Sequence, residues 1–141
     1  MVGIMDHVHE LNREPLEKIL TGNRSIETVF TRSEKAPYNT VQENDTIYFK
    51  LRDGYAVAKA TVKKVEKFDE LTPEKATEII KEHEEEISPE NRMFERDIYF
   101  NFATLIWLDN LFEIKPFRVK RNNGEFSKWT TVNDINTIRE E

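Results

Sequence analysis

A basic and an acidic side chain lie three residues apart in the stretch from Gly22 to Thr28, which contains Arg24 and Glu27. A guanidinium offers a planar set of donors to a phosphate or a base edge, and a carboxylate accepts from an amine or holds the guanidinium in place. The stretch follows a helix-like segment and opens a strand-like one, so Gly22 is expected just after the helix, where the chain needs a positive φ. Strand residues alternate faces, but a twist or bulge at the strand start would bring Arg24 and Glu27 towards one opening. The pair is either a surface ion pair or the polar centre of a binding cleft.

Aromatic and basic side chains elsewhere in the chain could add stacking surface and charge to such a cleft. Tyr48, Trp107 and Trp129 can each stack on an unpaired base, and each can equally belong to the core. Lys50 follows Tyr48 by two residues and could line the same cleft. The candidate ligand-binding residues are therefore Arg24, Glu27, Tyr48, Lys50, Trp107 and Lys115.

The distribution of charge matters more here than the net charge of −6. Residues 69–97 hold eleven acidic and four basic residues, which accounts for the whole imbalance. Residues 115–128, beginning with Lys115, carry five basic residues against a single glutamate. This basic stretch is weaker than that of a dedicated DNA-binding domain, and the acidic stretch would direct a nucleic acid to the opposite side of the molecule.

Several other chemistries are disfavoured by composition. The chain has no cysteine, so disulfides, thiolate zinc sites and cysteine nucleophiles are excluded. Its four glycines are spread out and form no phosphate-binding loop. His7 and His9 would share one face of a strand, but two imidazoles near a chain end make a weak metal site. We therefore predict neither a metal nor a cofactor.

The hydrophobic pattern predicts one α+β domain over residues 1–141, without a linker or internal repeat. A first strand at 7–11 and a short helix after Asn12 lead to a strand at 24–31. Alternation at 46–52 and 55–68 around Asp53-Gly54 predicts a β-hairpin. Its inner face carries Ile47 and Phe49 on one strand and small alanines on the other, while Tyr48, Lys50 and Arg52 face outwards.

The second half of the chain adds two helices and more strands. Thr72 and Pro73 begin one helix, and Ser88-Pro89 begins another that runs towards Arg96. Residues 102–117 are apolar enough for a strand buried on both faces, bent near Asp109-Asn110. Segments 118–121 and 126–130 flank Asn122-Asn123-Gly124 as a hairpin, and residues 133–139 are expected to form a terminal helix.

The order of these features resembles the ASCH domain, a branch of the PUA-like superfamily, whose motif is Gly-x-Lys-x-x-Glu-x-Arg. Gly22, Arg24 and Glu27 fall on its first three fixed positions, with arginine in place of lysine, and Val29 departs from the last. Segment 43–49, the long hairpin, the helical insertion and the strand with Trp107 follow in the family's order, so that the likeness spans about residues 8–120. The resemblance implies a small, closed, mixed β-barrel decorated with helices, one after the first strand and two in the acidic insertion 72–97. It also implies a cleft beside the first helix and an association with RNA.

Some ASCH proteins are amidohydrolases that act on an acetylated cytidine base through the motif lysine, a hydroxyl residue three positions later and a distant glutamate. Arg24 and Glu27 occupy the first two of these positions, and arginine cannot serve as a general base. That triad is therefore not reproduced here. Ribonuclease activity is also known in the family, so whether this protein is an enzyme stays open.

We accordingly predict a module that binds RNA or a modified nucleoside in a cleft centred on Arg24 and Glu27. The alternatives are a hydrolase of the same family, acting on an acylated nucleoside or on RNA, and a protein-interaction module that uses the acidic helices. The amino terminus lacks a basic region followed by an apolar one, and no apolar run is long enough to span a membrane. We expect a cytoplasmic protein without a membrane partner; the sequence does not predict its oligomeric state.

Overall fold

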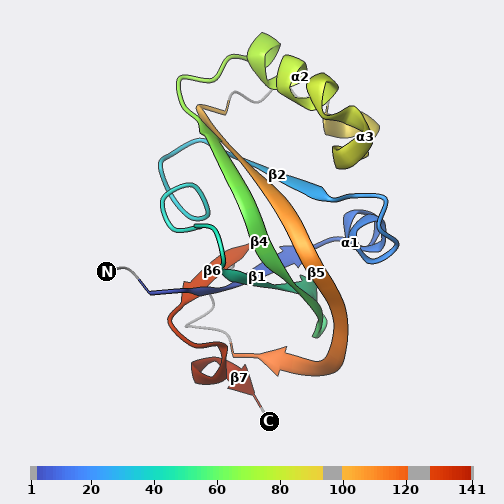
Figure 1. Ribbon diagram of the computed structural model, residues 1–141, viewed down its shortest axis with the longest axis vertical. Helices are drawn as coiled ribbons and strands as arrows, with labels where there is room; N and C mark the ends of the chain where they lie inside the picture. Colours follow the sequence, from blue (N-terminus) through green and yellow to red (C-terminus); the bar gives the residue numbers. More distant parts are fainter. Residues whose placement is uncertain (1–2, 94–99, 121–127, 141) are drawn as a thin grey trace.

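The computed structural model describes residues 3–93, 100–120 and 128–140. Within these ranges the strands are β1 (Asp6–Leu11), β2 (Ile26–Thr31), β3 (Thr46–Leu51), β4 (Ala56–Phe68), β5 (Phe102–Val119), β6 (Trp129–Val132) and β7 (Arg139–Glu140). The α-helices are α1 (Arg13–Leu20), α2 (Pro73–Glu82) and α3 (Glu84–Ile87), and short 3-10 helices cover Asn91–Met93 and Ile135–Thr137. Figure 1 shows α2 and α3 at one end of the molecule and β7 at the other.

The strands form one curled sheet in the order β2-β5-β4-β3-β1-β6, with β7 added beside β5. β1 and β3 run parallel and the other pairs run antiparallel, so the sheet is mixed. The predicted α+β class and the small barrel-like sheet with helices around it are confirmed. Within the described residues, however, the edge strands β2 and β6 do not pair with each other, so the sheet curls into a half-barrel that stays open between them.

The helix before the motif begins and ends as its sequence predicts. Asn12 is the N-cap residue of α1, and Pro15 lies in the first turn, where its missing amide costs no helical hydrogen bond. Leu16 and Ile19 bury the apolar stripe of the helix against the main core. Gly22 follows the helix with φ +82°, a conformation that suits glycine because it has no Cβ.

The β3–β4 hairpin is confirmed, with Asp53 at φ +60° in its turn. Ala58 and Ala60 are fully buried opposite Phe49 and Ile47, where small side chains allow the strands to approach the core closely. A register shift follows Phe49, so that Lys50 pairs with Ala56 and Ala56 joins a second small core on the other face of the sheet. Lys50 shares the face of Tyr48, as predicted, but this face is not open to solvent: the second core covers it, and Lys50 is only 5% exposed.

The apolar strand β5 is buried on both faces only in its first half. Ala103 to Ile106 lie between β2 and β4 and are almost completely buried. Beyond Asn110, which has φ +50° at the predicted bend, β5 runs beside β4 without β2, and Phe112 is 58% exposed. The prediction that the whole segment 102–117 is buried on both faces is wrong. Ala103 and Leu105 pack against the helices α2 and α3 and Ile106 packs in the main core, whereas most residues beyond Asn110 are exposed on one face.

The carboxyl-terminal strands pair differently from the prediction. β6 lies antiparallel to β1, and the end of β5 pairs with β7, so β5 and β6 do not form the expected hairpin. The predicted turn at Asn122-Asn123-Gly124 lies outside the described residues. In place of a terminal helix, the chain forms a 3-10 turn and then the short strand β7.

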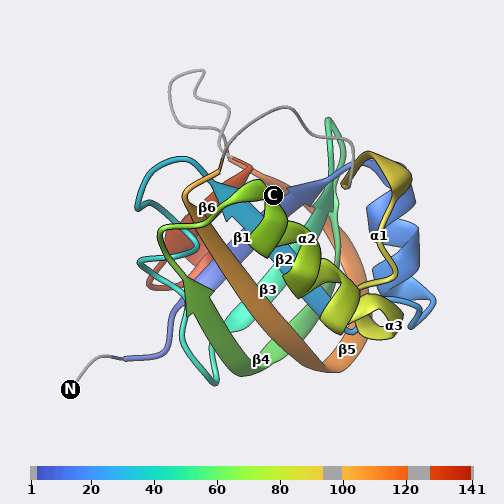
Figure 2. The same ribbon diagram turned by 90° about the horizontal axis from the view of Figure 1, so that it is seen from above.

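The helices of the acidic insertion pack over one end of the sheet, where α2 and α3 lie across β2 and β5 (Figure 2). Thr72 accepts from the Lys75 amide and so caps α2, as its sequence predicts. Ile79 and Ile87 contact Ile26 in a second core cluster. Ser88 does not begin a second helix but ends α3 at φ +49°, and the part of the predicted helix beyond residue 93 lies outside the described residues. Among the helices that the structure describes, none is long and apolar enough to cross a membrane.

Candidate functional site: a buried polar network beside a basic pocket

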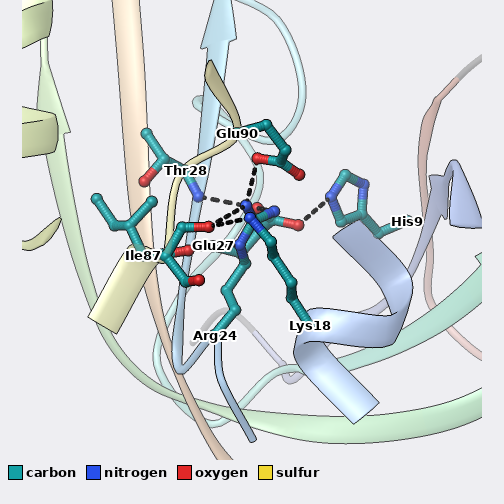
Figure 3. A network of polar contacts seen from close by, with 8 residues as sticks. His9, Lys18, Arg24, Glu27, Thr28, Ile87 and Glu90 are labelled. Carbon is teal, nitrogen blue, oxygen red and sulfur yellow. Dashed lines mark hydrogen bonds and ion pairs between the residues drawn. The ribbon is translucent and has the colours of Figure 1, made fainter. Parts of the chain in front are cut away.

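Arg24 and Glu27 are brought together, and both are buried. Their closest nitrogen and oxygen are 3.5 Å apart, and each residue is 4% exposed. The Arg24 amide donates to the Lys18 carbonyl as the chain leaves α1, and β2 then begins at Ile26. The tight connection between helix and strand thus points both side chains into the protein, as Figure 3 shows.

The Arg24 guanidinium holds the acidic insertion against β2. Its Nε donates to the Ile87 carbonyl at 2.7 Å, and one terminal nitrogen donates to the Ser88 carbonyl at 3.2 Å and to a Glu90 carboxylate oxygen at 2.5 Å. Lys18 of α1 donates to the same Ser88 carbonyl at 2.6 Å. Two cations therefore satisfy the carbonyls at the end of α3, and a buried charge pair fixes the segment that follows.

Glu27 connects this clamp, that is, Arg24 with its contacts to Ile87, Ser88 and Glu90, to strand β1. One carboxylate oxygen lies 2.9 Å from His9 Nε2, and the other accepts from the Thr28 amide at 3.1 Å (Figure 3). Burial works to raise the pKa of Glu27, but the His9 hydrogen bond, the charges of His9 and Arg24, and the Thr28 amide outweigh it and hold that pKa below its ordinary value of 4.5. Glu27 is thus ionised at neutral pH and can only accept, so the proton of this hydrogen bond belongs to His9 Nε2.

His9 also lines a pocket with a volume of about 760 Å³. Residues of β2 and of β6 contribute to its walls, so it occupies the gap where those two edge strands fail to pair. The loop after β2, including Ala36 and Pro37, closes another side. The open edge of the half-barrel is therefore a hollow, with the buried network behind one of its walls.

The pocket is strongly basic for a protein whose net charge is negative. Arg32, Lys35 and Lys128 line it, all three are exposed, and none has an ion-pair partner among the described residues. No carboxylate is among the described residues that line it. Three cations around one hollow, without an acidic partner in the described part of the chain, favour an anionic ligand.

Aromatic rings form the apolar part of the same walls. Phe30 and Phe100 are half-buried, with ring centroids 5.8 Å apart, and Trp129 packs 4.8 Å from His9. The Trp129 indole donates to His7 Nδ1 at 3.0 Å, so His7 Nε2 donates to Asp45 at 2.7 Å. Burial lowers the pKa of His7, against the opposing effect of Asp45, and keeps it neutral to accept from Trp129.

One buried hydroxyl in the pocket wall has no hydrogen-bond partner within the described parts of the chain. Thr31 is 7% exposed, and its Oγ1 contacts no donor or acceptor among the described residues. A buried polar atom left in this state costs free energy that a ligand could recover by bonding to it.

No protein-family model and no curated protein sequence matches this chain. Among solved structures, the ASCH protein from Zymomonas mobilis aligns with 79% of this chain and 71% of its own, at 14% identity and a TM-score of 0.59. Two mutant forms of the same protein each align with 94% of this chain and with 93% and 91% of theirs, at 12% and 14% identity and TM-scores of 0.62 and 0.63. The protein has the ASCH fold. At these identities the likeness concerns the fold alone.

Within this ASCH fold, four of the predicted site residues lie away from the pocket. Tyr48 lies on the opposite face of the sheet, edge-on to Phe117 at 5.7 Å, where burial raises the pKa of Tyr48. Lys50 lies on that face too, with its Nζ 3.3 Å from a Glu10 carboxylate oxygen. The predicted cleft that would join Tyr48 and Lys50 to Arg24 does not form, because the sheet separates them.

Trp107 and Lys115 are separated from the pocket along β5. Trp107 packs beneath the acidic insertion, edge-on to His83 at 5.5 Å, with Lys64 Nζ 4.5 Å from its ring centroid. Lys115 is exposed on the far half of β5. Neither is among the residues that line the pocket.

Apart from Trp129, which the sequence offered as a possible stacking surface, the residues of the pocket were not selected as ligand-binding residues. His9 was considered only as a metal ligand, and the described residues contain no group of three or more His, Cys, Asp or Glu able to hold a metal ion. Arg32 and Lys35 follow the motif directly, and Lys128 ends the basic stretch. The only sequence signal for these three residues is their positive charge. They lie in segments far apart in the chain, and only the fold brings them together.

Proposed function

We propose that this ASCH-fold protein binds RNA or a modified nucleoside in the pocket beside His9. The observation that carries the proposal is one hollow with aromatic walls and three cations, in which the described residues provide neither an ion-pair partner for those cations nor a lining carboxylate. A nucleotide presents a planar base and a negative phosphate, which match those two kinds of surface. An RNA ligand also agrees with the cytoplasmic location expected from the sequence.

In this proposal the base packs against the aromatic wall, and the phosphates meet the cations. The half-buried rings of Phe30 and Phe100 offer the stacking surface, because their apolar area is partly accessible from the pocket. Arg32, Lys35 and Lys128 hold the backbone, mostly without regard to base sequence. Such binding releases counterions and therefore weakens as salt is added.

Arg24 and Glu27 take an indirect part in this proposal. Both are too deeply buried to be the main contacts of a ligand, but Glu27 fixes the ring of His9, and Arg24 fixes Glu27. We place the centre of the binding site at His9 and treat the two motif residues as the support that orients it. This arrangement follows the general rule that a site is held rigid by the hydrogen bonds behind it.

The test is the binding of a short single-stranded RNA, followed by fluorescence anisotropy at several salt concentrations. We expect substitution of Arg32, Lys35 and Lys128 together by glutamine to weaken binding by at least tenfold. It should also reduce the slope of log K against log salt by about 0.7 for each phosphate that the variant no longer neutralises. Lys63→Gln removes an exposed lysine outside the pocket and is the matched control. RNA binding that the triple variant leaves unchanged would contradict the proposal.

A second candidate function, hydrolysis of the bound nucleoside or RNA, is favoured by the His9–Glu27 pair. An imidazole oriented by a carboxylate from behind is an arrangement that moves protons in many enzymes. His9 would then transfer the proton, and Glu27 would hold the ring. Product formation from an acylated nucleoside or from RNA, lost in His9→Gln while binding persists, would support this alternative over binding alone.

A further inference from the structure

We propose that the pocket recognises a terminal phosphate, that is, the phosphomonoester at the end of an RNA chain or on a nucleotide, in preference to an internal phosphodiester. The inference rests on the proposed function and specifies its ligand. Three features of the pocket support it: the excess of cations, the second ring nitrogen of His9 and the unpartnered hydroxyl of Thr31.

The first feature is the amount of positive charge in one place. A phosphodiester carries a single negative charge, whereas a phosphomonoester carries about −1.5 to −2 near pH 7. Arg32, Lys35 and Lys128 line the same pocket without ion-pair partners among the described residues. The electrostatic attraction to these three cations is therefore stronger for a doubly charged phosphate than for a singly charged one.

The second feature is His9, whose two ring nitrogens have unequal partners. Nε2 is held at 2.9 Å by the ionised Glu27, while the only partner of Nδ1 among the described residues is the Lys128 carbonyl at 3.5 Å, the outer limit of a hydrogen bond. Because Nε2 is already engaged by Glu27, Nδ1 is the ring nitrogen that keeps hydrogen-bonding capacity for a ligand in the pocket.

A phosphomonoester can form a hydrogen bond with Nδ1 in either direction. Its second pKa lies near 6, so near neutral pH it exists both as a monoanion, whose O–H can donate, and as a dianion, whose oxygens accept. An internal phosphodiester has no ionisable proton in this range, so its oxygens can only accept.

The third feature is Thr31, which is buried in the wall and has no hydrogen-bond partner for Oγ1 among the described residues. A hydroxyl can donate to a phosphate oxygen and is a common phosphate contact. A terminal phosphate has three non-bridging oxygens, enough to meet Thr31, His9 and one cation at once. A phosphodiester has only two.

The experiment compares three RNAs of identical short sequence, carrying a 5′-phosphate, a 3′-phosphate or hydroxyl groups at both ends. We expect one of the phosphorylated RNAs to bind about tenfold more tightly than the hydroxyl-ended RNA, which corresponds to about 1.4 kcal/mol. The end that is preferred identifies the source of the phosphate. This preference should largely disappear in Thr31→Val and in Lys128→Gln and should persist in Lys63→Gln.

The possible results separate this inference from the function on which it rests. If the hydroxyl-ended RNA binds within threefold of both phosphorylated RNAs, the terminal-phosphate inference is overturned and RNA binding stands. A preference that survives in both pocket variants overturns it as well, because the phosphate would then bind elsewhere. If none of the three RNAs binds, the proposed function fails together with the inference.

Discussion

Removal of the Arg24 charge should destabilise the protein strongly. Arg24→Met keeps much of the aliphatic packing but takes the guanidinium away from Glu27 and Glu90, whose side chains are only 5% and 6% exposed. Glu27 keeps His9 and the Thr28 amide, but Glu90 loses the one ion-pair partner that the described residues give it. Breaking a buried ion pair by removing one partner costs about 3–5 kcal/mol, because the other charge is left without compensation.

Urea unfolding followed by tryptophan fluorescence measures this loss. With a urea dependence of about 2 kcal/mol per molar, a loss of 3–5 kcal/mol lowers the unfolding midpoint by about 2 M. Lys75→Met is the matched control, because its ion pair with Glu78 joins side chains that are 48% and 67% exposed. We expect that control to stay within about 0.5 kcal/mol of the wild type.

A double variant locates the cause of the loss. Arg24→Met combined with Glu90→Gln should be less destabilised than the sum of the two single variants, by about 1 kcal/mol or more, because no unpaired charge remains at position 90. Hydrogen exchange at the Ser25 amide, which donates to the Glu86 carbonyl at 2.8 Å, should quicken as the insertion loosens. A loss below about 1 kcal/mol for Arg24→Met, or one no larger than that of the control, would refute the clamp.

Three further predictions concern the hydroxyl, the histidine and the tryptophans. Thr31→Val should raise the free energy of unfolding by up to about 1 kcal/mol, since it removes a buried hydroxyl without a partner among the described residues, and a clear loss in urea would contradict this. In the folded protein the pKa values of His7 and Glu27 lie below their ordinary values of 6.5 and 4.5, so the unfolded chain binds more protons on acidification. The stability that these two groups contribute is therefore fully present above pH 6.5 and is lost as the pH falls through their pKa values in the folded state. Glu27→Gln should flatten that loss below pH 4.5, and a stability that rises on acidification would exclude this account. Trp107→Phe should leave RNA affinity unchanged while Trp129→Phe weakens it, as measured by fluorescence anisotropy with thermal stability in parallel. If Trp107→Phe weakens binding and Trp129→Phe does not, RNA binds beside the acidic insertion and not in the pocket.

The elements that the sequence predicted best are those whose signals are local. Asn12, Pro15 and Gly22 mark the limits of the first helix through backbone preferences that act within a few residues. The Asp53-Gly54 turn and its flanking alternation predict the hairpin in the same way. Strand pairing at longer range was less predictable, and the partner of β6 proved to be β1 because a turn signal cannot identify a strand that is distant in sequence.

The same distinction between local and long-range contacts applies to the candidate site. The sequence by itself placed Arg24 and Glu27 together, because a spacing of three residues at the entry to a strand keeps two side chains close. Only the tertiary structure decided that they are buried, since the insertion that covers them comes more than sixty residues later. It also decided that His9, Thr31 and Lys128 share one hollow. Side chains from such distant segments meet only when long-range strand pairing brings them together, and in the part of the chain that the structure describes, the failure of β2 to pair with β6 leaves the hollow between them.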